Sequence, residues 1–218
     1  MSVENRVPSV RKQKIKKNHT KTRLIIFLIL ALALLLVAIF AQQLCPYDPN
    51  AQDTAMSLRP PSAAHPAGTD RFGRDMFSRI LVGLQTSVLA TLSLVVIITV
   101  IGTAVGVLCG YYGGIWDSVI MRISDVCLAF PGLVFALAIA ALLNGGLHNA
   151  VLALAVISWP KYARIARSQT LAQKSVNYIA AAKLAGNNSI QVIVKHILPN
   201  CIGPILVTAM LDIGTMLM

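Results

Sequence analysis

Asp212 is the residue whose position most favours a chemical role, because it lies inside an apolar segment close to the C-terminal end of the chain. Counted from Cys201, where that segment begins, it is about 16 Å along a helix. An ionisable group at such a depth in a bilayer is costly and usually faces a charged partner or a water-filled cavity. Two interpretations follow: Asp212 lines a translocation pathway and attracts a cationic substrate, or it is a structural partner for a polar group on another helix.

A second polar group lies between His65 and Arg79. His65 with Asp70 and Asp75 suggests a metal site, since imidazole and carboxylates are common metal ligands. The simpler interpretation is that Thr69 or Asp70 caps a helix and that Asp75 pairs with Arg79 four residues later. We therefore expect caps and surface ion pairs that shape a loop, and we predict no metal site.

Residues 177–200 are predicted to form a helix, a tight turn and a second helix. Residues 171–185 are rich in Ala, Leu and Lys, and Gly186 suits the left-handed position that ends a helix. Asn188 with Gln191 three residues later has the pattern of a capping box, and Pro199 is expected to bound the second helix. A DNA-reading unit would need its own apolar core, which this segment lacks, so we predict no nucleic-acid partner.

Motifs for catalysis and for nucleotide binding are missing from the sequence. There is no G-x-x-x-x-G-K-[ST] loop to hold ATP phosphates, and no Ser/His/Asp or Cys/His arrangement stands out. The four cysteines form no C-x-x-C pair. We predict that the chain is not an enzyme and binds no cofactor, so that any ATP used with it is bound by another polypeptide.

The elements that carry these residues are predicted to be membrane helices. A soluble domain normally carries about a quarter charged residues, whereas this chain has 12% charged and 56% hydrophobic residues. Apolar runs of about 20 helical residues are long enough to cross the hydrocarbon core. The fold class is therefore all-α, a polytopic transmembrane helical bundle, with five spans near residues 24–42, 86–109, 129–145, 147–160 and 201–218.

The distribution of the net charge of +11 predicts the orientation of these spans. The tail 1–23 and the block 161–200 are strongly basic, whereas the polar loop 43–85 has balanced charges. Lys and Arg are enriched on the cytoplasmic side of membrane proteins, so the N-terminus and 161–200 are predicted to be cytoplasmic and 43–85 external. The first apolar run is too long for a signal peptide and is expected to remain as a helix that contacts the lipid bilayer.

The run Ala180-Ala181-Ala182-Lys183-Leu184-Ala185-Gly186, followed by His196 and Leu198-Pro199, resembles the EAA loop of binding-protein-dependent importer permeases. The sequence departs from that family at Ala180, where the family has Glu. Three further stretches resemble the permeases for dipeptides, oligopeptides and nickel, namely 65–79, 110–131 and 159–164.

The resemblance implies a type I ABC importer permease in a bacterial inner membrane. The chain would contain five of the six spans of such a permease, its core would be residues 86–218 with the cytoplasmic coupling loop 161–200, and the chain is expected to be truncated after Met218. Family partners would be a second permease subunit, two ATPase subunits that dock on Ala180, Ala181, Ala182, Gly186, His196 and Pro199, and an external binding protein that meets the outer loop. Di- or oligopeptides and nickel stay open as substrates. An ion-coupled secondary carrier and a membrane-anchored regulator or scaffold are the alternative functions.

Overall fold

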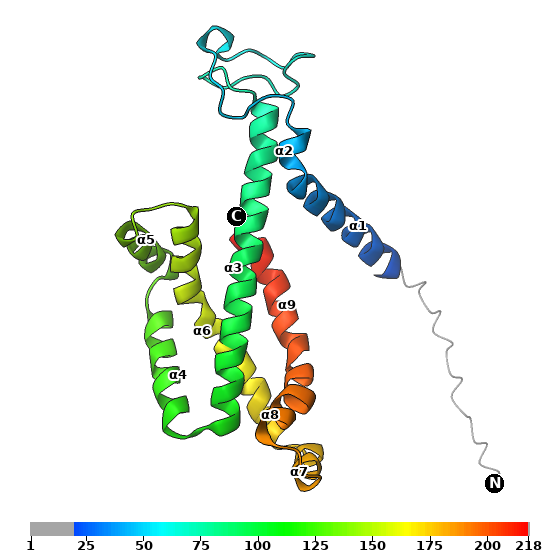
Figure 1. Cartoon of the computed structure of the whole chain (residues 1–218), viewed down its shortest axis with the longest axis vertical. Helices are drawn as coiled ribbons and strands as arrows, with labels where there is room; N and C mark the ends of the chain where they lie inside the picture. Colours follow the sequence, from blue (N-terminus) through cyan, green and yellow to red (C-terminus); the bar gives the residue numbers. More distant parts are fainter. Residues whose placement is uncertain (1–19, 218) are drawn as a thin grey trace, which may run out of the picture. The chain divides into compact units, whose positions relative to one another are not determined.

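The computed structural model describes residues 20–217 (Figure 1). It divides into two compact units, whose described parts are residues 20–81 and 82–217. Residues 1–19, which make up most of the predicted basic tail, and Met218 lie outside the described residues. The described part is helical and contains no β-strand, which confirms the predicted all-α class.

The described part of the first unit begins with the apolar helix α1 (Thr20–Ile39), which is followed by the short helix α2 (Ala41–Leu44). The large apolar side chains of α1 are exposed in this unit, which suits a helix surrounded by lipid. The polar loop that follows contains one short 3-10 turn, Thr54–Met56, and ends where helix α3 starts at Met76. The helix thus begins ten residues before the predicted span at 86, inside the segment expected to be loop.

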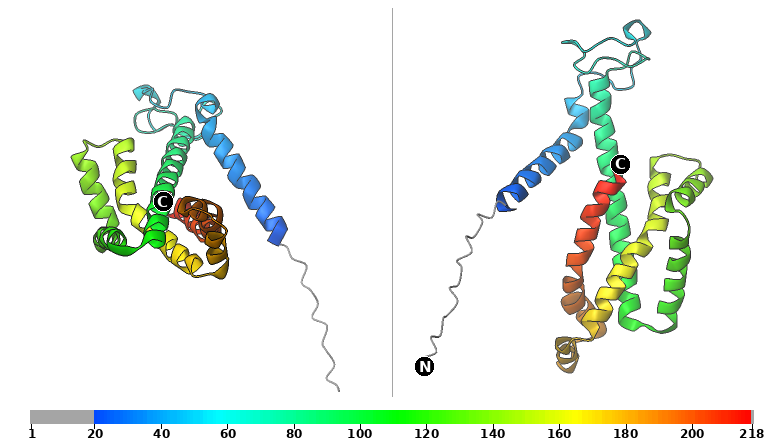
Figure 2. Two further views of the ribbon diagram at one scale, coloured as in Figure 1. Left: turned by 60° about the horizontal axis from the view of Figure 1, so that its bottom comes forward. Right: turned by 180° about the vertical axis from the view of Figure 1, so that it is seen from behind.

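The second unit packs the remaining helices around the C-terminal part of α3 (Met76–Tyr112). Helix α6 passes between α4 on one side and α9 on the other, and α7 and α8 lie at one end of the unit (Figures 1 and 2). Leu94, Ile98, Tyr162, Ile197 and Cys201 belong to its buried core. The helices after α3 are α4 (Gly114–Ala129), α5 (Gly132–Leu142), α6 (Leu147–Lys174), α7 (Asn177–Leu184), α8 (Ser189–Gln191), a π-helical segment (Val192–Ile197) and α9 (Leu198–Met216).

Three helices of the described part are long and apolar enough to cross a membrane, at Lys21–Ile39, Met76–Tyr112 and Ser189–Met216. Helices α4 and α5 add a fourth if they count as one span bent by 99°. The predicted spans at 129–145 and 147–160 differ most from this result. Helix α5 has 11 residues, or about 17 Å, which is shorter than the hydrocarbon core, and α6 continues through the cations beyond residue 160.

Helices α3 and α6 touch along a row of glycines on α3. A Cβ atom added to Gly102 would lie 2.5 Å from Tyr162 Cβ, and one added to Gly106 would lie 2.2 Å from the backbone oxygen of Ala163. At Gly110 the nearest atom, Thr170 Cβ, would be 2.8 Å away. The G-x-x-x-G-x-x-x-G spacing therefore lets the two helix backbones approach more closely than any side chain would permit.

Pro199 lies inside a continuous helical path and does not end a helix as predicted. The path runs from Ser189 to Met216, and Pro199 occupies the first turn of α9 directly after the π-helical segment. A proline in a regular helix removes one hydrogen bond and clashes with the preceding turn. The wider π-helical turns accommodate the missing donor here. A second difference is a break at Ser175–Val176, which divides the predicted helix 171–185 into α6 and α7.

Candidate functional site

The turn after α7 has the backbone geometry that the sequence predicts. Gly186 has φ +84°, the left-handed conformation that glycine adopts most readily. The Gly186 N–H donates to the Lys183 carbonyl at 3.0 Å, and the Asn187 N–H donates to the Ala182 carbonyl at 3.2 Å. These two bonds form a Schellman motif, so the prediction for Gly186 is confirmed.

The helix after this turn starts with the predicted capping box. The Gln191 N–H donates to Asn188 Oδ1 at 2.8 Å, and the Asn188 N–H donates to Gln191 Oε1 at 3.0 Å. Both termini that face the turn are therefore satisfied by local hydrogen bonds. The helix–turn–helix has a defined shape that is determined by its own sequence.

The helix–turn–helix exposes two large apolar side chains. Ile179 and Ala182 are buried against the rest of the unit, whereas Ala180 and Ala181 are exposed. Leu184 is 90% exposed and Ile190 is 68% exposed on the two sides of the turn. Large side chains that are this exposed beside a rigid turn are typical of surfaces that bind another protein.

Tyr178 ties α7 to the start of α9. Its hydroxyl donates to Gln173 Oε1 at 2.9 Å and contacts the His196 carbonyl at 3.2 Å, while Asn200 Nδ2 donates to the Tyr178 hydroxyl at 3.0 Å. The rings of Tyr178 and His196 lie 6.3 Å apart. The structure therefore brings His196 against α7, in the same end of the unit as Gly186 and Pro199.

Asp212 lies away from this turn and is partnered by α6. Lys161 Nζ is 2.6 Å from Asp212 Oδ1, and the Tyr162 hydroxyl donates to Asp212 Oδ2 at 3.0 Å. The Asp212 side chain is 7% exposed and that of Lys161 is 50% exposed. Lys161 lies about 20 Å along α6 from the end of that helix, and Asp212 is at a matching distance from the start of α9.

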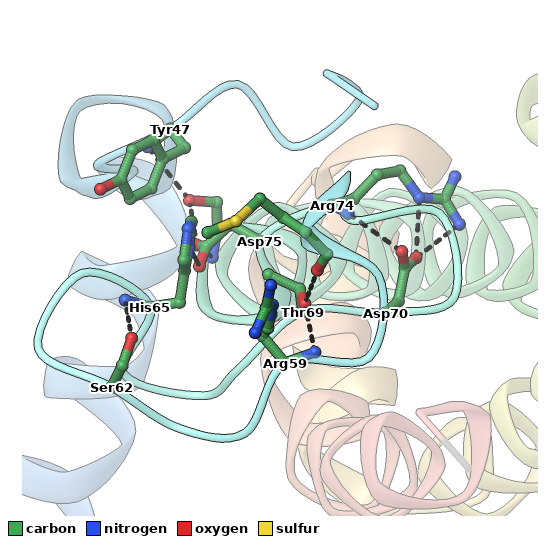
Figure 3. A network of polar contacts seen from close by, with 10 residues as sticks. Tyr47, Arg59, Ser62, His65, Thr69, Asp70, Arg74 and Asp75 are labelled. Carbon is green, nitrogen blue, oxygen red and sulfur yellow. Dashed lines mark hydrogen bonds and ion pairs between the residues drawn. The ribbon is translucent and has the colours of Figure 1, made fainter. Parts of the chain in front are cut away.

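The polar loop of the first unit, which precedes α3, is organised by Asp75 (Figure 3). His65 Nδ1 lies 3.0 Å from Asp75 Oδ1, and Asp75 Oδ2 accepts from both the N–H and the hydroxyl of Ser78. The Ser78 hydroxyl also accepts from the Tyr47 N–H at 3.3 Å. Tyr47, His65 and Asp75 help to line a pocket of about 310 Å³ in this loop. Asp75 thus connects two distant parts of the loop to the first turn of α3.

The Asp75 side chain, and neither Thr69 nor Asp70, accepts from the Ser78 N–H in the first turn of α3. Asp70 instead forms a turn, since its Oδ1 accepts from the N–H groups of Phe72 and Arg74. Its Oδ2 pairs with the Arg74 side chain at 2.7 Å and lies 3.9 Å from Arg79 Nε. The expected Asp75–Arg79 pair is therefore replaced, because the Asp75 side chain is already committed to His65 and Ser78. Among residues 20–217 there is no group of three metal-ligating side chains.

The stability of the polar loop before α3 is expected to depend on pH through the ionisation of Asp75. Burial by itself would raise the pKa of Asp75, but the bonds from Ser78 and His65 outweigh burial and hold this pKa below the usual 3.8. A carboxyl with a depressed pKa stabilises the fold above its unfolded-state pKa, and this contribution is lost as the pH falls through the folded-state pKa. We expect the loop to resist proteolysis at pH 7 and to open below about pH 4.

Limited proteolysis of Asp75→Asn checks the origin of this effect. Asparagine has no charge and one acceptor oxygen in place of two, so it cannot accept from Ser78 and from His65 at once. We therefore expect the loop to be cut at pH 7, with a loss of about 1–3 kcal/mol of local stability. Asp48→Asn is the matched control, because Asp48 is exposed and the bond that its side chain accepts comes from the neighbouring Asn50 N–H. Equal cleavage of the two variants at pH 7 would contradict the role of Asp75.

The sequence interpretation did not identify four functional-site residues that the structure brings forward. Lys161 and Tyr162 are the partners of Asp212, and Leu184 and Ile190 are the exposed side chains beside the turn. The first pair could not be found from spacing, because some 50 residues separate each of them from Asp212. The exposed pair lies within the segment that was singled out, but apolar residues on a short amphipathic helix are normally expected to be buried.

Two family patterns match this sequence. The family described as "Binding-protein-dependent transport system inner membrane component" matches residues 102–218, and the one described as "N-terminal TM domain of oligopeptide transport permease C" matches residues 21–61. The first match includes α6, α9 and the whole helix–turn–helix. The second match lies in the first unit.

Named relatives are similar over most of this chain. It is 46% identical over 187 residues to the "Probable D,D-dipeptide transport system permease protein" of Escherichia coli strain K12, covering 86% of this chain and 63% of that protein. It is 42% identical over 184 residues to a glutathione transport system permease protein of Pectobacterium atrosepticum, covering 84% and 61% respectively. A glutathione permease protein of Shigella dysenteriae is 41% identical over 204 residues, covering 93% and 66%.

The chain thus spans about three fifths to two thirds of the length of these relatives. The family match covers more than half of the chain and contains each structural feature of the turn between α7 and α8. The apolar helices of the described part agree with a protein that crosses the membrane several times. This chain belongs to the family of binding-protein-dependent transport system inner membrane components.

Proposed function

We propose that this chain is a permease subunit of an ATP-driven importer of small peptides, located in a bacterial inner membrane with its N-terminus in the cytoplasm. It would act with a second permease subunit, an external binding protein and two ATPase subunits that bind and hydrolyse the ATP. The relatives named for D,D-dipeptide and glutathione transport support a peptide substrate. Nickel, which the sequence resemblance leaves open as a substrate, is included in the test below.

The observation that carries the proposal is the rigid, exposed turn between α7 and α8. Its shape is determined by the Gly186 motif and the Asn188 capping box, and Leu184 projects from it almost fully exposed. We propose that the ATPase docks here, on Ala180, Ala181 and Leu184. Because Ala180 carries no charge, the contact would depend on apolar burial, worth about 1.5–3 kcal/mol for one leucine.

Asp212 is proposed to act on the translocation pathway through Lys161. Both carboxylate oxygens of Asp212 are engaged, one by Lys161 and one by Tyr162. A direct attraction of a cationic substrate would need a free carboxylate, whereas the Lys161 ammonium is half-exposed. Asp212 would thus hold Lys161 in place, and Lys161 would face the pathway.

The proposal is tested by uptake into proteoliposomes that contain the full-length permease pair, the ATPases and the binding protein. Labelled dipeptide, glutathione and nickel ion are compared with and without ATP. We expect ATP-dependent accumulation of a peptide substrate. Absence of ATP-dependent uptake of all three substrates would contradict the proposed function.

Leu184→Glu in the same complex tests the docking surface. We expect uptake to fall at least about tenfold, because a buried carboxylate without a partner costs several kcal/mol at an interface. The amount of permease in the membrane should stay unchanged, since Leu184 makes little contact within this chain. Ile115→Glu is the control, because Ile115 is 81% exposed at the start of α4, at the same end of the unit (Figure 1). Equal uptake by the two variants would place the docking surface elsewhere.

A further inference from the structure

The carboxylates of the second unit all bind one helix. Residues 82–218 contain three acidic residues, Asp117, Asp125 and Asp212, and each forms an ion pair with a cation of α6. Arg167 binds Asp117 through two hydrogen bonds of 2.6 Å, and Arg164 binds Asp125. Lys161 binds Asp212 at 2.6 Å. Helix α6 itself contains no acidic residue.

The spacing of the three cations allows α6 to hold two neighbours at once. Lys161, Arg164 and Arg167 are three residues apart, so each step moves about 4.5 Å along the axis and turns about 60° around it. Lys161 and Arg167 therefore point about 120° apart. This rotation agrees with the positions of α9 and α4 on different sides of α6 (Figure 2).

The three pairs differ in strength. The Arg164 and Asp125 side chains are each about half-exposed, and such pairs contribute little. The Asp117 and Asp212 side chains are 12% and 7% exposed, and Asp117 is held by a two-bond guanidinium contact. Loss of one partner from such a pair leaves an uncompensated buried charge, which is strongly unfavourable. Arg167–Asp117 and Lys161–Asp212 are thus the decisive links.

Helix α6 also leads directly to the proposed ATPase-docking turn. It ends at Lys174, and only Ser175 and Val176 separate it from α7. The close backbone contact at the glycine row adds α3 to the helices that are packed against α6. A displacement of the turn therefore acts first on α6, and whatever is fixed to α6 must move with it.

We propose that Lys161, Arg164 and Arg167 form an ion-pair ladder that makes α4 and α9 follow α6 when the ATPase moves the turn. The proposal rests on the proposed function and goes beyond it by naming positioning residues within the membrane unit. None of them needs to touch ATP or the substrate. Their role is to convert movement at one end of α6 into movement of its two neighbours.

The test is the ratio of substrate imported to ATP hydrolysed, measured in proteoliposomes with the complete complex. For Asp117→Asn and Arg167→Gln we expect ATP hydrolysis to persist while the ratio falls at least about tenfold, a coupling loss of the usual allosteric size. Arg122→Gln is the matched control, because Arg122 is an exposed cation on α4 outside the ladder. It should keep the ratio of the unsubstituted complex.

Two double variants separate transmission from folding. Asp117→Asn with Arg167→Gln leaves no unpaired charge, so the protein should return to normal abundance but remain uncoupled. Asp117→Arg with Arg167→Asp restores the pair in reverse and should recover much of the ratio. A normal ratio in the neutral double variant would overturn the ladder, whereas absent uptake by the unsubstituted complex would instead count against the proposed function.

Discussion

Replacement of Gly106 by alanine is expected to separate α3 from α6 and to destabilise the second unit by more than about 3 kcal/mol. The added Cβ would lie 2.2 Å from the backbone oxygen of Ala163 and 2.8 Å from Ala166 Cβ. Neither atom can rotate away, since one is backbone and the other is the first atom of a packed side chain. The helices must therefore move apart and lose the contacts of the buried core around Val107 and Ala166.

The measurement is the thermal unfolding midpoint of the purified protein in detergent, together with its abundance in the membrane. Gly83→Ala is the matched control, because Gly83 lies on the same helix and nothing lies within 4 Å of its added Cβ. Alanine there should be neutral or stabilise by up to about 1 kcal/mol, since glycine is unfavourable inside a helix. An equal midpoint for both variants would show that the glycine row does not determine the packing of α3 on α6.

Gly186→Pro is expected to abolish transport while membrane insertion stays normal. Proline has a fixed φ near −65°, whereas Gly186 has φ +84°. The change also removes the N–H that donates to the Lys183 carbonyl. Nothing lies within 4 Å of an added Cβ at Gly186, so the effect arises from the backbone and not from a clash. The turn would lose its shape, and the proposed docking surface around Leu184 would be displaced.

Uptake and membrane abundance are measured for this variant beside Gly186→Asn. Asparagine tolerates the left-handed conformation better than other residues with a side chain. We therefore expect Gly186→Asn to retain a substantial part of the uptake, while Gly186→Pro has none. Unchanged uptake by Gly186→Pro would remove the turn from the coupling mechanism.

The Gly106 and Gly186 substitutions are expected to lower uptake for different reasons. Gly106 determines how α6 lies on α3, whereas Gly186 determines the shape of the turn that is proposed to act on α6. The first substitution should lower the unfolding midpoint and thereby uptake, and the second should lower uptake at a normal midpoint. We expect this difference in the unfolding midpoint. It would contradict the idea that both substitutions lower uptake by one mechanism.

Local features of the candidate site could be predicted from sequence because they depend on neighbours within a few residues. The left-handed Gly186 and the Asn188–Gln191 capping box were predicted and are confirmed, since both use hydrogen bonds between adjacent turns. The helical class followed from the apolar composition, because a backbone in lipid must satisfy its own hydrogen bonds and a helix does so between residues four positions apart. The roles proposed for Ala180, His196 and Pro199 stay predictions.

The ends and number of the membrane helices were predicted less well. Hydropathy marks apolar residues, but α3 begins within the polar loop because Asp75 caps it there. Pro199 was expected to end a helix, and the π-helical segment before it permits the helix to continue. Helix α6 runs past Lys161 to Lys174, and the Arg164 and Arg167 side chains on this stretch are paired with acids of α4.

The sequence by itself thus determined that lipid surrounds the chain, that the fold is helical and that a tight turn follows residue 185, because each depends on composition or on short-range hydrogen bonds. The family resemblance followed from its motifs. Only the tertiary structure decided which helix each charge meets. Asp212 and Lys161 are 51 residues apart, which is much farther than the residues of a local motif. Their contact depends on how α6 and α9 pack. The spacing of the three glycines on α3 does not indicate which helix packs against them, and the tertiary structure places α6 there. Long-range pairs require the whole fold, since their distance is determined by every packed residue between them.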